Sequence, residues 1–150
     1  MDVFKPSCLS PAQIESVLRA RGIQPTAQRI AIGRYVLCEA DHPTAEHVKQ
    51  WVDGNFPKIS LATVYNTLRA FVEAGLLREV RLPDRDAVVF DNLTSPHHHF
   101  LDEETGTVHD LPLDAVEVKV LVGPEFDVRT ATVLVRGTRR APEPATEPST

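Results

Sequence analysis

Residues 60–91 read SLATVYNTLRAFVEAGLLREVRLPDRDAVVFD, and this stretch decides the fold. Ser60 is a favourable helix N-cap, apolar residues recur after it at helical spacing, and Gly75 is a typical C-cap. The β-prone residues 76–82 and 87–91 follow, separated by turn-forming residues. A helix followed by such a hairpin predicts a winged helix-turn-helix, in which the helix enters the major groove of DNA and the hairpin follows the backbone.

Three more helices are predicted upstream of this stretch. Each starts after a residue that can cap a helix N-terminus, namely Ser10, Thr26 and Thr44. The first helix is expected to stop at Gly22 and the second to end before Asp41. Apolar residues at helical spacing predict inward faces made of Ile14, Val17, Leu18, Ile30, Gly33, Val36, Leu37, Val48, Trp51, Val52, Val64, Leu68, Phe71 and Val72.

A cluster of potential metal ligands follows the hairpin. His97 and His99 are two residues apart, so on a β-strand their imidazoles project from the same face and can bind one ion, while His98 points away. Asp91 lies shortly before these histidines in the sequence, and Asp110 lies shortly after them. Because imidazole and carboxylate ligands without thiolate suit Fe(II), Mn(II) or Zn(II) better than Cu(I), the cluster predicts a site for such an ion.

The composition is that of an ordinary soluble protein, with 150 residues and 42% hydrophobic content. No segment approaches the roughly 20 apolar residues that span a bilayer, and residues 1–10 lack the features of a signal peptide. We therefore expect a cytoplasmic protein with no membrane partner. Cys8 and Cys38 are widely spaced and belong to no C-x-x-C motif, so we interpret both as small apolar residues, without a disulfide or a thiolate zinc site.

The charge is unevenly distributed along the chain, whose net charge is −5. Residues 1–81 hold ten Lys or Arg and eight Asp or Glu, whereas residues 82–150 hold six and thirteen. A mildly basic first half can approach DNA phosphate, and an acidic second half attracts cations. This division fits a protein with two parts.

Four separated motifs resemble the ferric uptake regulator family: GIQPTAQR (22–29), HPTAE (42–46), SLATVYNTL (60–68), and FD (90–91) with HHH (97–99). The resemblance runs from about residue 10 to residue 112. It implies an α+β protein that is a dimeric, metal-responsive repressor and not an enzyme. The expected domains are a winged helix-turn-helix with a hinge (1–91), a small α/β metal-binding and dimerisation domain (92–136) and a disordered tail (137–150).

The resemblance also implies a regulatory metal site. One Fe(II), Mn(II) or Zn(II) ion per protomer would be bound by residues from both halves of the chain, because His42 belongs to the DNA-binding half. An ion that binds only a closed arrangement shifts the population toward it, and the two recognition helices of the dimer then fit a palindromic operator. The implied ligands are His42, Asp91, His97, His99 and Asp110.

The expected DNA contacts centre on helix 61–74. Tyr65 is the strongest candidate for a base contact, through its ring against a thymine methyl group. Ser60 and Thr63 at the start of the helix suit phosphate. The full set of expected DNA-binding residues is Arg19, Arg21, Ser60, Thr63, Tyr65, Asn66 and Arg69.

The chain departs from the common family pattern where many relatives carry a C-x-x-C pair. It has residues 102–105, DEET, at that place, so a structural zinc site made of four cysteines is expected to be absent. The dimer would then rest on strand pairing and apolar packing. The alternation of apolar residues in 116–122 and 128–134 predicts two strands for this purpose.

Several alternatives remain open at the level of sequence. Within the family, one branch responds to peroxide and another, the iron response regulators, is associated with haem. A haem could be bound through His98, and Asp110 fits either branch. Two histidines and a carboxylate also resemble the iron site of non-haem Fe(II) enzymes, although an enzyme has no need of a winged helix-turn-helix. A further alternative is a DNA-binding protein that has lost its metal site.

Overall fold

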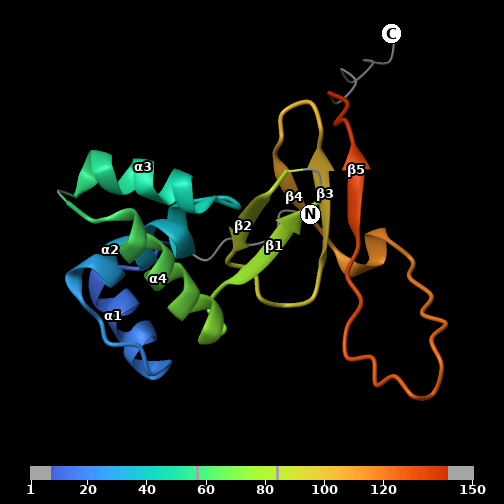
Figure 1. Cartoon of the computed structure of the whole chain (residues 1–150), viewed down its shortest axis with the longest axis horizontal. Helices are drawn as coiled ribbons and strands as arrows, with labels where there is room; N and C mark the ends of the chain where they lie inside the picture. Colours follow the sequence, from blue (N-terminus) through green and yellow to red (C-terminus); the bar gives the residue numbers. More distant parts are fainter. Residues whose placement is uncertain (1–7, 57, 84, 142–150) are drawn as a thin grey trace, which may run out of the picture. The chain divides into compact units, whose positions relative to one another are not determined.

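The computed structural model describes residues 8–56, 58–83 and 85–141. The chain divides into two compact units, with the boundary between Ser95 and Pro96. Within the described residues, the first unit contains four α-helices and a two-stranded hairpin, and the second contains a three-stranded sheet (Figure 1).

The four helices of the first unit begin where the sequence predicts. They are α1 (Pro11–Ala20), α2 (Ala27–Arg34), α3 (Ala45–Asn55) and α4 (Leu61–Glu73). Each is preceded by the predicted capping residue, whose side-chain oxygen accepts a hydrogen bond from the backbone N–H three residues later. These N-cap predictions for Ser10, Thr26, Thr44 and Ser60 are confirmed.

The end of the second helix differs from the prediction of one regular helix. After α2 the chain continues as a π-helical turn, Tyr35–Glu39, in which the N–H of Ala40 reaches the carbonyl of Tyr35. A π-turn widens the helix and leaves carbonyl groups without their regular partners. The side-chain amide of Asn92 donates to two of them, those of Val36 and Leu37, at 3.2 and 3.3 Å.

The core of the first unit contains residues from all four helices. Phe71 of α4 is fully buried, and Gly33 of α2 packs so closely that a Cβ there would lie 3.1 Å from Cγ2 of Ile14. Five of the predicted inward residues are only partly buried and pack at the edge of the core: Val17, Ile30, Leu37, Trp51 and Val72. Trp51 stacks on Tyr35 with ring centroids 4.6 Å apart, which fixes α3 against the π-turn.

The predicted wing is present. Strands β1 (Arg78–Leu82) and β2 (Ala87–Asp91) pair antiparallel with Arg78 opposite Asp91. The first strand starts later than predicted because Leu76 and Leu77 turn back from α4 and are buried in the helical core. Since α3 and α4 are joined by a short connection, they form the helix-turn-helix that precedes this wing.

The second unit is built on its central strand. Strand β3 (His98–Asp102) pairs antiparallel with β4 (Val108–Leu111) and parallel with β5 (Leu134–Gly137). Among the described residues of this unit, helical structure is limited to the 3-10 turn Leu113–Ala115.

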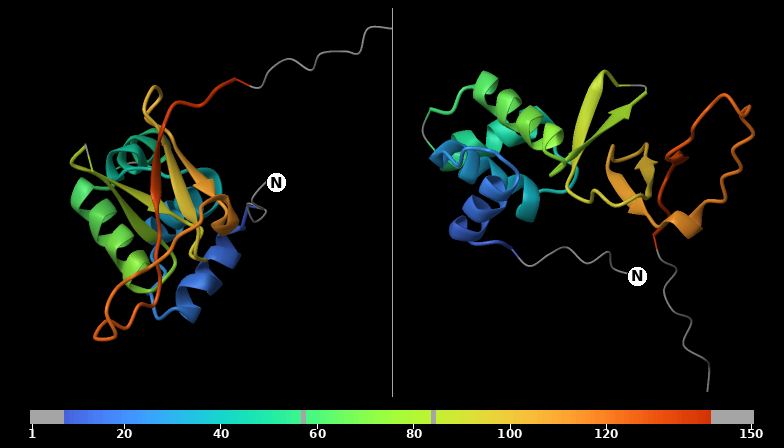
Figure 2. Two further views of the ribbon diagram at one scale, coloured as in Figure 1. Left: turned by 90° about the vertical axis from the view of Figure 1, so that its right-hand side faces the viewer. Right: turned by 90° about the horizontal axis from the view of Figure 1, so that it is seen from below.

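The strands predicted for residues 116–122 and 128–134 are wrong for this chain. Residues 116–133 form a wide irregular loop, and only Leu134 belongs to a strand (Figure 2). Alternation gives a segment two faces, but a strand also needs a neighbouring backbone to hydrogen-bond with. Several apolar side chains of the loop are exposed: Val118, Val120, Leu121, Val122, Phe126 and Val128.

Gly137 still belongs to β5, and residues 142–150 of the expected disordered tail lie outside the described residues. None of the described helices is long and apolar enough to cross a bilayer.

Candidate metal centre and DNA-binding face

His42 lies in the loop between the π-turn and α3, and two tethers hold this loop beside the end of β2. The carbonyl of Pro43 accepts a hydrogen bond of 2.9 Å from the N–H of Phe90, and Asn92 is bound to the π-turn. Asp91 stands between the two tethered residues. The backbone of His42 has φ of 46°, a left-handed conformation that is uncommon outside glycine. The local fold of the first unit therefore brings His42 to Asp91.

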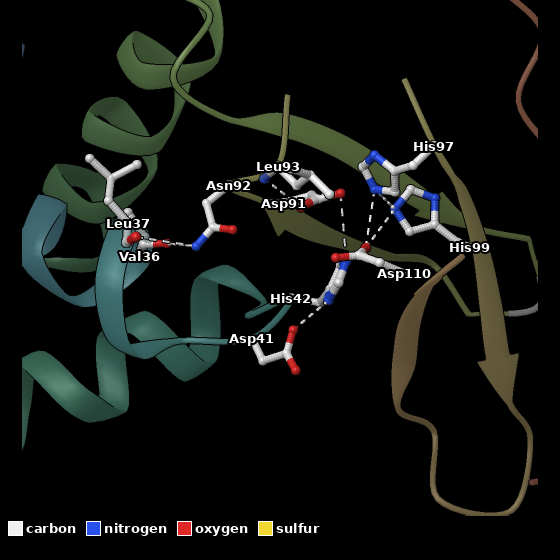
Figure 3. Close-up of polar contacts among 10 residues, drawn as sticks. All are labelled: Val36, Leu37, Asp41, His42, Asp91, Asn92, Leu93, His97, His99 and Asp110. Atoms are coloured by element: carbon white, nitrogen blue, oxygen red, sulfur yellow. Dashed lines mark hydrogen bonds and ion pairs between the residues drawn. The ribbon is translucent and has the colours of Figure 1, made fainter. Parts of the chain in front are cut away.

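The side chains of His42 and Asp91 face each other (Figure 3). Nε2 of His42 lies 3.6 Å from Oδ2 of Asp91, and Nδ1 of His42 donates to the carboxylate of Asp41 at 2.8 Å. Because Nδ1 carries the proton in this hydrogen bond, Nε2 of a neutral imidazole keeps its lone pair. The other oxygen of Asp91 accepts a 2.8 Å hydrogen bond from the N–H of Leu93, which fixes the carboxylate.

The second unit gathers three further donors. Nε2 of His97 lies 3.0 Å from Nε2 of His99 and 3.1 Å from Oδ1 of Asp110. Nε2 of His99 lies 3.6 Å from the same oxygen. His99 and Asp110 are directly opposite each other in the β3–β4 pair, so their side chains project from the same face of the sheet (Figure 3).

Both groups of donors suit a divalent ion. Imidazole nitrogen and carboxylate oxygen bind such ions at about 2.0–2.2 Å, so neighbouring ligands of a tetrahedral or octahedral site are roughly 2.8–3.6 Å apart. The separations in the second unit, 3.0, 3.1 and 3.6 Å, lie in this range, as does the 3.6 Å between His42 and Asp91. Nitrogen and oxygen donors without thiolate fit Fe(II), Mn(II) or Zn(II).

His98 has a different place from its two neighbours. It is buried in the centre of the three-stranded sheet, and its Nδ1 accepts a 3.0 Å hydrogen bond from the N–H of Val133. That bond satisfies the backbone just before β5. His98 therefore helps to hold β5 beside β3.

Tyr65 is the aromatic residue among those expected to contact DNA, and its side chain is 45% exposed. Its hydroxyl donates to the carboxylate of Glu46, at the start of α3, over 2.9 Å. This hydrogen bond raises the pKa of Tyr65 above its usual value of 10.0, so the hydroxyl stays protonated at neutral pH. The backbone N–H of Glu46 and then Tyr65 lower the pKa of the Glu46 carboxyl, which is ionised at neutral pH. The contact fixes the ring across the two helices of the helix-turn-helix.

A groove of about 600 Å³ lies between α4 and the wing. Tyr65, Asn66 and Arg69 line it from α4, and Arg81 lines it from β1. The acidic Glu46, Glu79 and Asp86 also line it, so the groove has mixed charge.

Comparison with known proteins identifies the chain. A model of the ferric uptake regulator family matches residues 20–124, which is well over half of the chain. The chain belongs to the ferric uptake regulator family. The resemblance predicted from the four motifs is therefore confirmed.

Among family members, the peroxide operon regulator of Bacillus subtilis is 41% identical over 103 residues, which cover 67% of this chain and 70% of that protein. The peroxide-responsive repressor PerR of Staphylococcus epidermidis is 39% identical over 114 residues, or 74% of this chain and 75% of that protein.

Solved structures of the family share the fold. The Vibrio cholerae ferric uptake regulator has a TM-score of 0.66 at 21% identity, covering 83% of this chain and 98% of that one. The Pseudomonas aeruginosa ferric uptake regulator, solved with manganese, has a TM-score of 0.62 at 23% identity, covering 85% and 98%. The predicted α+β fold class, a winged helix-turn-helix followed by a small domain of the family's type, is confirmed.

Most of the remaining residues expected to contact DNA have partners within the first unit. Arg19 pairs with Glu15 at 2.8 Å, Arg69 pairs with Glu73 at 3.1 Å, and both arginines are exposed. Arg21 donates to the carbonyl of Ala74 at 2.9 Å and so caps the end of α4. The hydroxyl of Ser60 accepts from the N–H of Thr63 and lies 2.9 Å from its hydroxyl. Asn66 is exposed on α4.

Three residues with a part in these sites were missed by sequence reasoning. Asp41 orients the ring of His42, Asn92 ties β2 to the π-turn, and Glu46 binds the hydroxyl of Tyr65. An acidic residue directly before a candidate ligand histidine was a usable signal for Asp41. Asn92 and Glu46 contact residues that are 56 and 19 positions away in sequence, and no local sequence pattern predicts such contacts.

Proposed function

We propose that this family member is a metal-dependent, DNA-binding transcriptional repressor that controls genes of peroxide stress or iron homeostasis. The observation that supports it most is the presence of fixed imidazole and carboxylate donors in both units: His42 and Asp91 in the DNA-binding unit, and His97, His99 and Asp110 in the second. The names of the relatives at 39–41% identity favour peroxide as the signal.

In this proposal the five donors serve one regulatory ion per protomer. Two donors are too few for a tight site and three leave positions open, since Fe(II), Mn(II) and Zn(II) take four to six ligands. The hinge between Asp91 and His97 is short, so the two groups are close along the chain. The bound ion supplies a positive centre that holds imidazole and carboxylate ligands from both units together.

The chain's own residues prepare the site and connect it to DNA. Asp41 keeps Nε2 of His42 available, and the N–H of Leu93 holds the carboxylate of Asp91 in place. His42 leads directly into α3, the first helix of the helix-turn-helix, so fixing this loop fixes the helices that present Tyr65. We further propose a homodimer whose two α4 helices bind successive major grooves of a palindromic operator.

The direct test is DNA binding by the wild-type chain in a gel-shift assay with a palindromic, operator-like duplex. Mn(II) or Fe(II) is expected to tighten binding by about 10–100-fold over chelator-treated protein, the usual size of such coupling. Peroxide given to the Fe(II)-loaded protein is expected to release the DNA if peroxide is the signal. Binding of equal strength with and without each ion would refute the proposal.

The same assay separates the competing functions. Adding haem in place of a metal ion tests the prediction that His98 or a neighbour binds haem. An Fe(II)-dependent enzyme would show no preference for operator over random DNA, whatever ion is present. Family membership favours the regulator over that enzyme.

Base recognition by Tyr65 can be measured separately. Tyr65→Ala is expected to weaken operator binding by about 10-fold or more, because the ring loses its contact with a thymine methyl group. Glu46→Gln keeps an acceptor for the hydroxyl and should bind almost as well as the wild type. The measurement is fluorescence anisotropy at fixed salt with two duplexes, one normal and one with uracil in place of thymine.

The uracil duplex provides the control. Because uracil lacks the methyl group, the wild type should bind it more weakly, whereas Tyr65→Ala should bind both duplexes equally. If the wild type and Tyr65→Ala lost the same factor of affinity on the uracil duplex, Tyr65 would make no contact with the thymine methyl group.

A further inference from the structure

Two cysteines that are 30 residues apart in sequence lie together in the first unit. The N–H of Leu9 donates to Sγ of Cys38 at 3.0 Å, which brings Cys8 to the π-turn. Cys8 directly precedes Leu9, and the nearby Cys8 thiol contributes to a raised pKa of the Cys38 thiol. Leu9 and Cys38 both pack against the helical core, and the capping box of Ser10 and Gln13 fixes the chain on the other side of Leu9. The contact is thus held by the fold.

The two thiols have different environments. Cys8 is exposed, while Cys38 is partly buried, and this burial raises the pKa of the Cys38 thiol above its ordinary value. An exposed thiol is the accessible point of attack for a small oxidant, and a raised pKa leaves less reactive thiolate at Cys38, so Cys8 is expected to react first. Cys38 is the neighbouring thiol that can then react with the product. Neither cysteine belongs to the groups of metal donors described above.

We propose that Cys8 and Cys38 form a peroxide-sensitive dithiol that closes to an intramolecular disulfide. The Cys8 sulfur attacks hydrogen peroxide, an S–O bond forms as the O–O bond breaks, and one water leaves. The Cys38 sulfur then displaces the hydroxyl of the Cys8 sulfenic acid, with release of a second water and formation of the S–S bond. Overall, two thiols lose two electrons and two protons, and one peroxide is reduced to two waters.

The disulfide would cross-link the segment before α1 to the π-turn that leads to the His42 loop. It would enclose α1 and α2 in one covalent loop of 31 residues, counted from Cys8 to Cys38. Closing a loop of this length disfavours the unfolded chain. The oxidised first unit is therefore expected to be more stable than the reduced one.

The test treats the reduced full-length chain with hydrogen peroxide after removal of metal by a chelator. We expect the intact mass to fall by about 2 Da, both thiols to become unreactive, and a cross-linked peptide to contain both cysteines. Cys8→Ser and Cys38→Ser are the matched controls. Cys38→Ser keeps the exposed Cys8, so peroxide should leave a sulfenic acid that dimedone traps, whereas Cys8→Ser keeps only the partly buried Cys38 and should react more slowly. Neither variant should form an intramolecular bond.

Thermal unfolding distinguishes a bond that fits the native fold from one formed in the unfolded chain. The midpoint of the oxidised wild type should rise by roughly 5 °C or more, and dithiothreitol should reverse the rise. The proposal fails if both thiols stay free, if only disulfides between two chains form, or if the bond lowers the midpoint. An Fe(II)-loaded sample is a useful parallel, because oxidation of a ligand imidazole adds mass, so the outcome for the metal site is read separately.

Discussion

His42→Ala is expected to abolish the effect of Mn(II) or Fe(II) on DNA binding while the chain stays folded. The substitution removes the only imidazole that the described DNA-binding unit holds beside Asp91. Loss of even an indirect partner of a metal ligand typically weakens metal binding by about 10–100-fold, so loss of a ligand should weaken it by at least the upper value. Gel-shift titration of DNA, repeated over a range of Mn(II) concentration, measures both effects.

His109→Ala is the matched control for this experiment. His109 is next to Asp110 in β4, but side chains alternate along a strand, so it lies on the other face, near the ring of Phe100. This variant should keep the full metal response. If His42→Ala kept the metal response as well, with normal circular dichroism, the shared-ion proposal would be wrong.

The parts of the fold that the sequence predicts are those that local chemistry determines. Ser10, Thr26, Thr44 and Ser60 cap helices because a short polar side chain satisfies backbone N–H groups three residues away, whatever surrounds the helix. The wing is equally local, because turn residues separate two β-prone stretches. The alternation in residues 116–134 predicts two strands that do not form, since strand pairing depends on a distant backbone.

The sequence also predicts part of the candidate site. His97 and His99 share a face because of their spacing on a strand, and this is visible in the sequence. The resemblance to the family supplied His42. The contact of Asn92 with the π-turn was beyond sequence reasoning, because it depends on where helix α2 widens. The contact between Cys8 and Cys38 was missed for the same reason: only the packing of Leu9 on the core brings the two thiols together.

Phe71→Ala is expected to lower the free energy of unfolding of the first unit by about 3–5 kcal/mol, a large share of the roughly 5–15 kcal/mol that stabilises a typical domain. Phe71 is fully buried in α4, and its ring lies against α2, 3.5 Å from the position of a Cβ on Gly33. The truncation leaves a cavity that the close packing of Gly33 and Ile14 cannot fill without moving a helix.

Fluorescence of Trp51 during urea unfolding measures this change, because Trp51 is the single tryptophan of the chain and stacks on Tyr35 within the same unit. Phe126→Ala is the control: Phe126 is 62% exposed in the wide loop, so the same truncation should change stability by no more than about 0.5 kcal/mol. Equal shifts for both variants would contradict the described core. A large shift for Phe71→Ala alone would also predict weaker operator binding near the unfolding midpoint, since Tyr65 is presented by the same helix.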